Sequence, residues 1–187
     1  MGEGQIIFLN GASSSGKSTV AKALQEALEE PYMHVSVDRF FEMLHPRYMD
    51  MELPRELMIA VMEGFQRSVA ALASTGNNVI VDHVLAGKRF LRECVELMGD
   101  MPVIFVGVRA PLDVLKQREL ERGDRHVGLA EFQFERVHQD IIYDIEIDTS
   151  ASSPEECARQ IIDALRAERT GPSAFARIRD AMGAETV

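Results

Sequence analysis

The sequence predicts an α/β protein in which a parallel sheet is covered by helices on both faces. Two observations support this fold class. Short apolar runs alternate along the chain with longer stretches of helical periodicity. Several of the short runs, such as Val103–Val108, are apolar at nearly every position, which is typical of parallel strands that are buried on both faces. We therefore expect a three-layer α/β/α architecture with right-handed crossovers.

The order of the elements follows from the same patterns. The apolar runs predict strands at Gln5–Asn10, Met33–Val37, Asn78–Asp82, Pro102–Val108 and Asp144–Asp148. The helical patterns lie at Lys17–Glu29, Arg55–Ser74, Lys88–Met98, Leu112–Arg122, Leu129–Gln139 and Pro154–Glu168. The last helix has a clear start, because Ser153 precedes a proline and two acids. We expect one domain over residues 1–169 and a tail over 170–187, whose amphipathic segment Ala174–Met182 is either a docking helix or a frayed end.

Composition excludes several classes of protein. The 187-residue chain has 20 basic and 30 acidic residues, and the resulting net charge of −10 argues against a nucleic-acid-binding surface. We expect no membrane association, because no run of 18 apolar residues exists. Cys94 and Cys157 lack metal-ligand spacing and are expected to be reduced thiols. Since the first residues carry no targeting signal, we expect a cytoplasmic protein, and its oligomeric state stays open.

A glycine-rich loop follows the first predicted strand. Residues 11–18 read GASSSGKS and fit the pattern G-x-x-x-x-G-K-[ST], with the strand before it and the helix after it that this motif requires. Backbone N–H groups of such a loop meet a polyphosphate at a helix N-terminus. We expect Lys17 to reach the β- and γ-phosphates of ATP and Ser18 to ligate Mg²⁺. The full set of expected ATP contacts in the loop is Gly11, Ala12, Ser13, Ser14, Ser15, Gly16, Lys17, Ser18 and Thr19.

Polar residues stand at the carboxyl ends of two other strands, where folds of this class bind ligands. Asp38 could accept a proton from an acceptor hydroxyl or help to hold Mg²⁺, or it could simply cap the following helix. Asp82 takes the place of a Walker-B acid and is predicted to hold Mg²⁺, with a cap or turn role as the alternative. His83 either contacts the acceptor or satisfies a local hydrogen bond, and both interpretations stay open.

An arginine cluster after the fourth strand predicts a lid over about residues 118–136. Arg118, Arg122 and Arg125 recur at near-helical spacing. Such a lid would screen charge on a migrating phosphoryl group and exclude water, with Arg125 in a catalytic role and the other two arginines on the nucleotide. The alternative is a solvated helix face paired with neighbouring glutamates. The loop that begins at Thr149 either contacts adenine or only caps the last helix.

The segment between the second strand and the third is expected to cover an acceptor. Half of the ten methionines fall within Arg39–Phe65, and Phe40, Phe41 and Leu44 are predicted to line the pocket. Methionine and aromatic side chains form adaptable apolar pockets, although the same pattern also describes the packed face of a helix. A pocket of this kind suits a bulky, weakly charged small molecule with a hydroxyl group better than a small polyanion.

Several longer motifs occur in a specific order: Ile7–Ser18, Ser36–Asp38, Val79–Asp82, Phe105–Arg109, Arg122–Arg125, Tyr143–Thr149 and Glu155–Ala158. Through them the chain resembles the chloramphenicol phosphotransferase family up to about Leu165. The resemblance implies transfer of the ATP γ-phosphate to a hydroxyl group of an antibiotic. It implies Asp38 as the base, Lys17 and Ser18 on phosphate and Mg²⁺, and lid arginines around the phosphates. It also implies a P-loop kinase fold like that of shikimate kinase, with five parallel strands in the order 2-3-1-4-5.

Three functions remain open at this point. The first is a small-molecule kinase of the chloramphenicol phosphotransferase type. The second is a kinase for another metabolite alcohol, such as shikimate or a gluconate-like sugar acid. The third is a nucleotide-dependent switch without an acceptor. The chain departs from the family between Asp38 and Gly76 and again at His83, so the sequence leaves the acceptor undetermined.

Overall fold

A five-stranded parallel sheet forms the centre of the protein. The computed structural model describes residues 2–48, 53–123, 128–168 and 170–184. The strands lie in the order β2-β3-β1-β4-β5, which confirms the order implied by the family resemblance. Their bounds are β1 Ile6–Asn10, β2 Tyr32–Ser36, β3 Asn78–His83, β4 Val103–Arg109 and β5 Ile145–Asp148.

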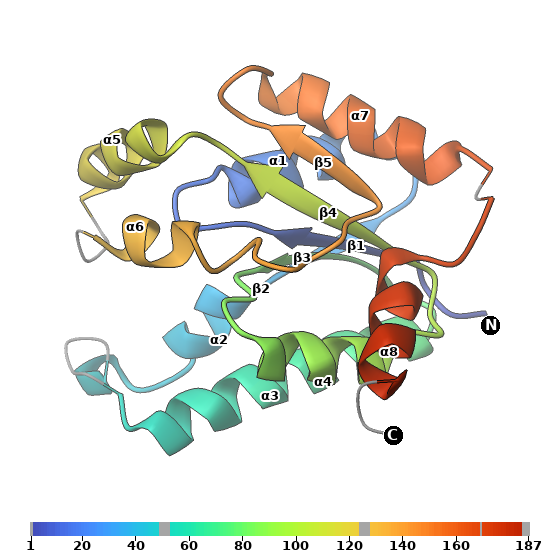
Figure 1. Cartoon of the computed structure of the whole chain (residues 1–187), viewed down its shortest axis with the longest axis horizontal. Coiled ribbons are helices and arrows are strands. Elements are labelled where there is room, and N and C mark those ends of the chain that lie inside the picture. The colour runs from blue at the N-terminus through green and yellow to red at the C-terminus, as the bar shows by residue number, and fades with distance from the viewer. Residues whose placement is uncertain (1, 49–52, 124–127, 169, 185–187) are drawn as a thin grey trace.

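Helices cover both faces of this sheet, which confirms the predicted α/β/α class. Figure 1 shows α1 and α7 on one face, α3, α4 and α8 on the other, and α5 and α6 beyond one end of the strands. The helices are α1 Lys17–Ala27, α2 Val37–Glu42, α3 Arg55–Ser74, α4 Lys88–Met98, α5 Leu112–Arg122, α6 Leu129–Phe134, α7 Pro154–Arg166 and α8 Ala174–Ala184. A single 3₁₀ turn, Pro46–Tyr48, follows α2.

Alternate residues of the central strand point into two separate cores. Ile6 and Phe8 of β1 pack with α3, α4 and α8, whereas Ile7 and Leu9 pack with α1 and α7. All four side chains are fully buried. This alternation follows from the two-residue period of a strand, and burial on both faces explains why the central strands are apolar at nearly every position. The carboxyl end of β1 therefore stands at the middle of a rigid sheet edge.

Some element ends differ from the sequence prediction. The second strand ends at Ser36, and α2 begins at Val37, so Asp38 lies in the first turn of a short helix. The helix predicted from Leu129 to Gln139 ends at Phe134 and continues as turns that reach Asp140 with a φ of 56°. The start of α7 is as predicted, and Ser153 forms a capping box with Glu156.

The segment after residue 170 forms a helix that packs on the sheet. Phe175 of α8 is fully buried, and its ring lies 5.3 Å from that of Phe8 and 4.8 Å from that of Phe105. Of the two interpretations of the tail segment, docking therefore describes α8. None of the helices in the described ranges is both long enough and apolar enough to cross a membrane.

Candidate active site

The loop between β1 and α1 has the backbone geometry of an anion-binding nest. Ser14 and Gly16 have left-handed φ values of 61° and 87°. At Gly11 a Cβ would stand 2.4 Å from the Val108 carbonyl oxygen, so only glycine fits. The hydroxyl oxygens of Ser14 and Ser15 are buried and have no hydrogen-bond partner within the described part of the chain. Buried polar groups of this kind call for a polar ligand.

Lys17 holds its charge directly over this loop. The side chain is buried, and its Nζ donates hydrogen bonds to the carbonyl oxygens of Gly11 at 3.0 Å and Ala12 at 2.8 Å. A cation at the N-terminus of α1 adds to the positive end of the helix dipole. The loop and the lysine together favour a strongly negative group.

Asp82 brings a carboxylate next to the loop from the end of β3. Ser18 Oγ donates to Asp82 Oδ2 at 2.6 Å, and His34 Nε2 lies 3.7 Å from the same oxygen. Burial alone would raise the pKa of Asp82, but the nearby His34, Lys17 and Ser18 outweigh burial and lower this pKa to about 2. Asp82 is therefore ionised at neutral pH. A carboxylate oxygen beside a hydroxyl oxygen is a pair of ligands that suits Mg²⁺.

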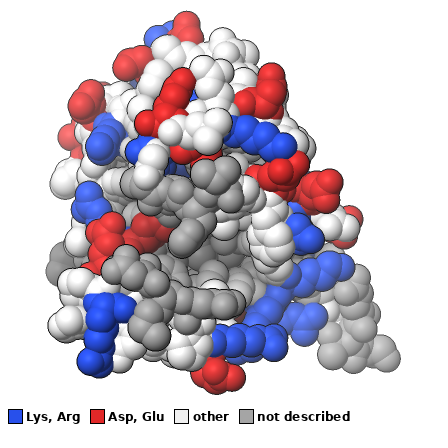
Figure 2. Space-filling model, turned by 90° about the vertical axis from the view of Figure 1, so that its left-hand side faces the viewer, with Lys and Arg blue, Asp and Glu red and all other residues white. Residues whose placement is uncertain are grey.

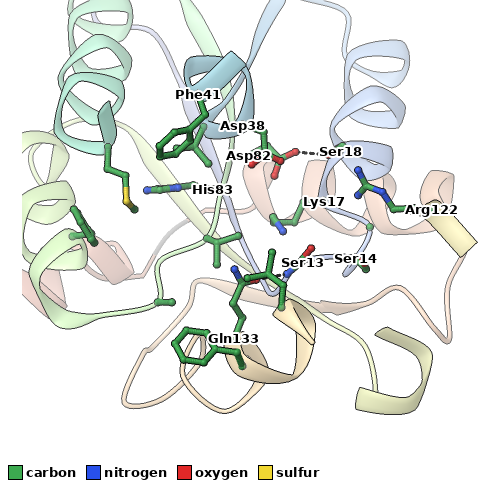
Figure 3. A pocket seen from close by; sticks show the side chains of 18 of the residues that line it. Ser13, Ser14, Lys17, Ser18, Asp38, Phe41, Asp82, His83, Arg122 and Gln133 are labelled. Carbon is green, nitrogen blue, oxygen red and sulfur yellow. Dashed lines mark hydrogen bonds between the residues drawn. The ribbon is translucent and has the colours of Figure 1, made fainter. Parts of the chain in front are cut away.

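A cavity of about 370 Å³ joins the loop to an apolar chamber. Figure 2 looks onto the carboxyl ends of the strands and shows this face hollowed at its centre. Figure 3 shows Lys17, Asp38 and Asp82 around the middle of the cavity, with Phe41 and His83 on one side. The apolar end is lined by Val37, Phe41, Met58, Met62, Val84, Ala86, Phe90, Leu129 and Phe132.

His83 brings a buried polar group to this cavity. Its Nε2 lies 3.5 Å from Gln66 Nε2, and both side chains are fully buried. Among the described residues, His83 Nδ1 and Gln66 Oε1 have no hydrogen-bond partner. Burial lowers the pKa of His83 to about 3, with a further lowering by Lys17 and opposing effects of Asp82 and Asp38. His83 thus brings an uncharged polar ring to the cavity wall, and Gln66 lies beside this ring without lining the cavity in the described structure.

A second cavity, of about 410 Å³, adjoins the first at the loop. It is lined by Ser14, Gly16, Thr19 and Arg122, which the first cavity shares, and by residues of α5 and the β5–α7 loop. Arg118 donates to Thr149 Oγ1 at 2.9 Å and to the Thr149 carbonyl at 2.8 Å, and Thr149 Oγ1 donates to the Ser15 carbonyl at 2.8 Å. Arg118 and Thr149 therefore connect α5 to the loop.

Most of the chain matches one protein family. The family described as chloramphenicol phosphotransferase-like protein matches residues 4–166. The chain belongs to the chloramphenicol phosphotransferase-like family. Two curated relatives from two strains of Mycobacterium tuberculosis are each 32% identical over 202 residues, which cover 96% of this chain and 89% of theirs. Both carry the provisional name O-phosphotransferase.

Solved structures of small-molecule kinases share the fold. The APS kinase of Mycobacterium tuberculosis, in complex with AMPPNP and APS, superposes with a TM-score of 0.71 at 17% identity, covering 89% of this chain and 100% of its own. Shikimate kinase from Acinetobacter baumannii, in complex with shikimate, gives a TM-score of 0.66 at 17% identity over 90% and 96%. A gluconokinase from Sinorhizobium meliloti gives 0.62 at 19% identity over 99% and 98%. At such identities the likeness is one of fold.

A buried acid of α5 holds the start of α6. Glu119 of α5 is 2% exposed, and its two carboxylate oxygens accept from the backbone N–H groups of Gly128 and Ala130, each at 2.8 Å. These bonds fix the start of α6. Arg122 lines both cavities, whereas Arg125 lies outside the described residues.

The structure brings most, but not all, of the predicted site residues together. Phe40 is not among the residues that line the first cavity in the described chain; it packs edge-to-face on Phe65, 5.1 Å between ring centres. Leu44 likewise does not line it. Sequence reasoning missed Phe90, Phe132 and Gln133, which line the cavity from α4 and α6. Phe132 lies in the predicted lid and Phe90 in the predicted helix Lys88–Met98, so their apolar character could have marked both residues. Nothing in the pattern marks Gln133.

Proposed function

We propose that the protein transfers the γ-phosphoryl group of ATP, with Mg²⁺, to a hydroxyl group of a small uncharged molecule, in the manner of a chloramphenicol 3-O-phosphotransferase. One observation carries this proposal. A single cavity is lined at one end by the phosphate loop, in the middle by Asp38 and at the other end by apolar side chains. A donor phosphoryl group and an acceptor hydroxyl can therefore meet within it.

The residues at the loop fit the donor. Ser18 and Asp82 offer an oxygen pair 2.6 Å apart that would hold Mg²⁺, and this ion neutralises phosphate charge when bound. Lys17 would bind the β- and γ-phosphates from its place over the loop. The second cavity, next to Arg118 and Thr149, would receive the adenosine part of the nucleotide. Arg122, on the wall between the cavities, and Arg125 would screen the phosphoryl charge.

Asp38 has the position expected of the base. It is half-buried in the first turn of α2 and lines the cavity on the side opposite the loop. A carboxylate there would accept the proton of an acceptor hydroxyl as the oxygen attacks the phosphoryl group. Its neighbours Val37 and Phe41 would hold the body of the acceptor beside it.

The chamber favours an uncharged acceptor. In the described part of the cavity wall, the cationic side chains are Lys17 and Arg122, and both belong to the end near the loop. An acceptor carboxylate, such as that of shikimate or gluconate, would be left without a cation, and burying such a charge is costly. His83, which lines the cavity, would instead offer a hydrogen bond from an uncharged ring to an amide or nitro group. This supports an aromatic antibiotic alcohol over a sugar acid.

The proposal is tested with γ-labelled ATP and a panel of acceptors: chloramphenicol, shikimate and gluconate. We expect label in chloramphenicol and none in the two acids, and we expect labelling of chloramphenicol to be about 10²–10⁴ slower when Asp38→Asn replaces the wild type. Label in shikimate or gluconate would favour the metabolite kinase instead. Nucleotide hydrolysis that ignores every alcohol and responds to a protein partner would favour the nucleotide switch.

A further inference from the structure

Gln133 of α6 occupies a backbone donor of the phosphate loop. The Ser13 N–H donates a hydrogen bond to Gln133 Oε1 at 2.7 Å. Ser13 is only 6% exposed, and both residues line the first cavity. Figure 3 shows Gln133 reaching the loop from the side opposite Asp38 and Asp82, with Lys17 between them.

Ser13 lies on the side of the loop that faces the first cavity. Ser14 and Gly16 line both cavities, whereas Ser13 lines only the one that contains Asp38. The Ser13 N–H therefore lies at the acceptor end of the loop, where the terminal phosphoryl group of a nucleoside triphosphate would lie. Backbone N–H groups of such a loop bind phosphate oxygens. The amide oxygen of Gln133 therefore occupies the place at the Ser13 N–H that a phosphate oxygen would take.

The fold holds Gln133 at this position from both sides. The start of α6 is fixed by the two hydrogen bonds to Glu119 described above. Beyond the helix, the carbonyl oxygen of Val137 accepts a hydrogen bond of 3.0 Å from Asn10 Nδ2, at the end of β1. Ala130 and Val137 are buried in a small core with Ala12 of the loop. The contact is thus part of the packed structure between the lid and the sheet.

We propose that Gln133 is a positioning residue for the terminal phosphoryl group, and that it distinguishes a nucleoside triphosphate from a diphosphate. This inference rests on the proposed function, since it requires nucleotide on the loop. An amide carries both an acceptor and a donor. Its oxygen accepts the Ser13 N–H until a phosphoryl oxygen takes that N–H, and the amide then turns so that Nε2 donates to the phosphoryl oxygen. A diphosphate lacks that oxygen and leaves the Ser13–Gln133 bond intact.

The test measures binding of AMPPNP and of ADP, each with Mg²⁺, by calorimetry in the absence of acceptor. Gln133→Glu keeps the size and the acceptor but replaces the donor with a negative charge. We expect its affinity for AMPPNP to fall at least about tenfold, with the affinity for ADP changed less than about threefold. Gln133→Met, which has neither donor nor acceptor, should lose a few-fold in AMPPNP affinity only. The exposed Gln139→Glu adds the same charge outside this cavity and should bind both nucleotides as the wild type does.

Each outcome separates this inference from the function on which it rests. Equal losses for AMPPNP and ADP in Gln133→Glu, or no loss in either, overturn the role of Gln133 and leave the phosphotransfer proposal standing. Selective loss of AMPPNP supports the role even if no tested alcohol is phosphorylated. A wild-type protein that binds neither nucleotide overturns both. Thermal unfolding of each variant shows that the binding changes are measured on folded protein.

Discussion

The Ser18 hydroxyl donates its hydrogen bond directly to the Asp82 carboxylate, and the two oxygens are 2.6 Å apart. One residue comes from the first turn of α1 and the other from the end of β3. The parallel pairing of β1 with β3, in which Leu9 lies opposite Asp82, brings these two distant parts of the sequence together. The proposed magnesium site thus depends on strand register.

Replacement of Asp82 by asparagine removes the buried charge but keeps the shape. We expect Mg²⁺-dependent nucleotide binding to weaken about 10–100-fold. Ser18→Ala should act on the same site, so the double variant should lose less than the sum of the two single losses. Calorimetric titration with Mg²⁺ and nucleotide measures this. The exposed Asp163→Asn is the control, and an unchanged Mg²⁺ requirement in Asp82→Asn would contradict the assignment.

Replacement of Asp38 by asparagine tests the proposed base. Ser36, not Asp38, is the N-cap of α2, and asparagine has nearly the size of aspartate, so α2 should persist while the proton acceptor is lost. We expect kcat to fall by about 10²–10⁴ with nucleotide affinity unchanged. Single-turnover phosphorylation of the acceptor provides the rate, and direct binding provides the affinity. Full activity in this variant would exclude Asp38 as the base.

A methyl group at Gly107 should destabilise the sheet. An added Cβ would stand 2.8 Å from the nearest ring carbon of Tyr143, and that ring is held by Phe105 at 4.7 Å and by a hydrogen bond of 2.8 Å from Asn10. We expect Gly107→Ala to lower the free energy of unfolding by about 1–3 kcal/mol.

Gly64→Ala is the matched control for this substitution. Gly64 lies inside α3, and its added Cβ would meet nothing within 4 Å among the described residues. This variant should raise the free energy of unfolding by about 0.5–1 kcal/mol, because alanine loses less backbone entropy in a helix. Urea unfolding of both variants provides the comparison, and a stable Gly107→Ala protein would show that the Tyr143 ring can move.

His138 makes stability depend on pH. Its Nδ1 lies 2.7 Å from Tyr143 Oη; burial, with the charge of Arg109, lowers the pKa of His138 to about 4, against an ordinary value of 6.5. As pH falls below about 6.5, His138 binds a proton in the unfolded chain, whereas in the folded chain it binds one only near pH 4. We expect the free energy of unfolding to fall between about pH 6.5 and pH 4, with His138 contributing at most about 1.4 kcal/mol per pH unit. Above about pH 6.5, His138 should have no effect on it.

Substitution separates this contribution from that of other groups. His138→Gln should flatten the pH dependence of the unfolding free energy between pH 4 and 6.5. The exposed His45→Gln should leave it as in the wild type. Urea unfolding at a series of pH values measures the slope, and an unchanged slope in His138→Gln would show that this histidine does not titrate as described.

The sequence predicted the centre of the sheet well because β1, β3 and β4 are buried on both faces. The run Val103–Val108 is short and rich in β-branched residues, which favours a buried strand over a buried helix, and the loop motif located the carboxyl edge. Helix ends were less certain. The pattern from Leu129 continues past Phe134, but Val137 is fixed by Asn10 and the chain turns instead.

The acceptor side could be predicted only in part. Phe41 and Phe40 are adjacent in sequence and equally apolar, yet one faces the cavity and the other packs on Phe65. Which of them does so depends on how α2 lies on α3, and local patterns carry no information about that contact. Gln133 illustrates the same limit, because its partner Ser13 is 120 residues away.

The two cavities adjoin, and Ser14, Gly16, Thr19 and Arg122 line both of them. Nucleotide and acceptor would therefore occupy neighbouring spaces at the same time, and neither would need to leave before the other arrives. An inhibitor that links an adenosine group to an aromatic alcohol through a phosphate bridge would fill both cavities. Its two halves would gain from effective concentration, so that two modest ligands would become one tight ligand.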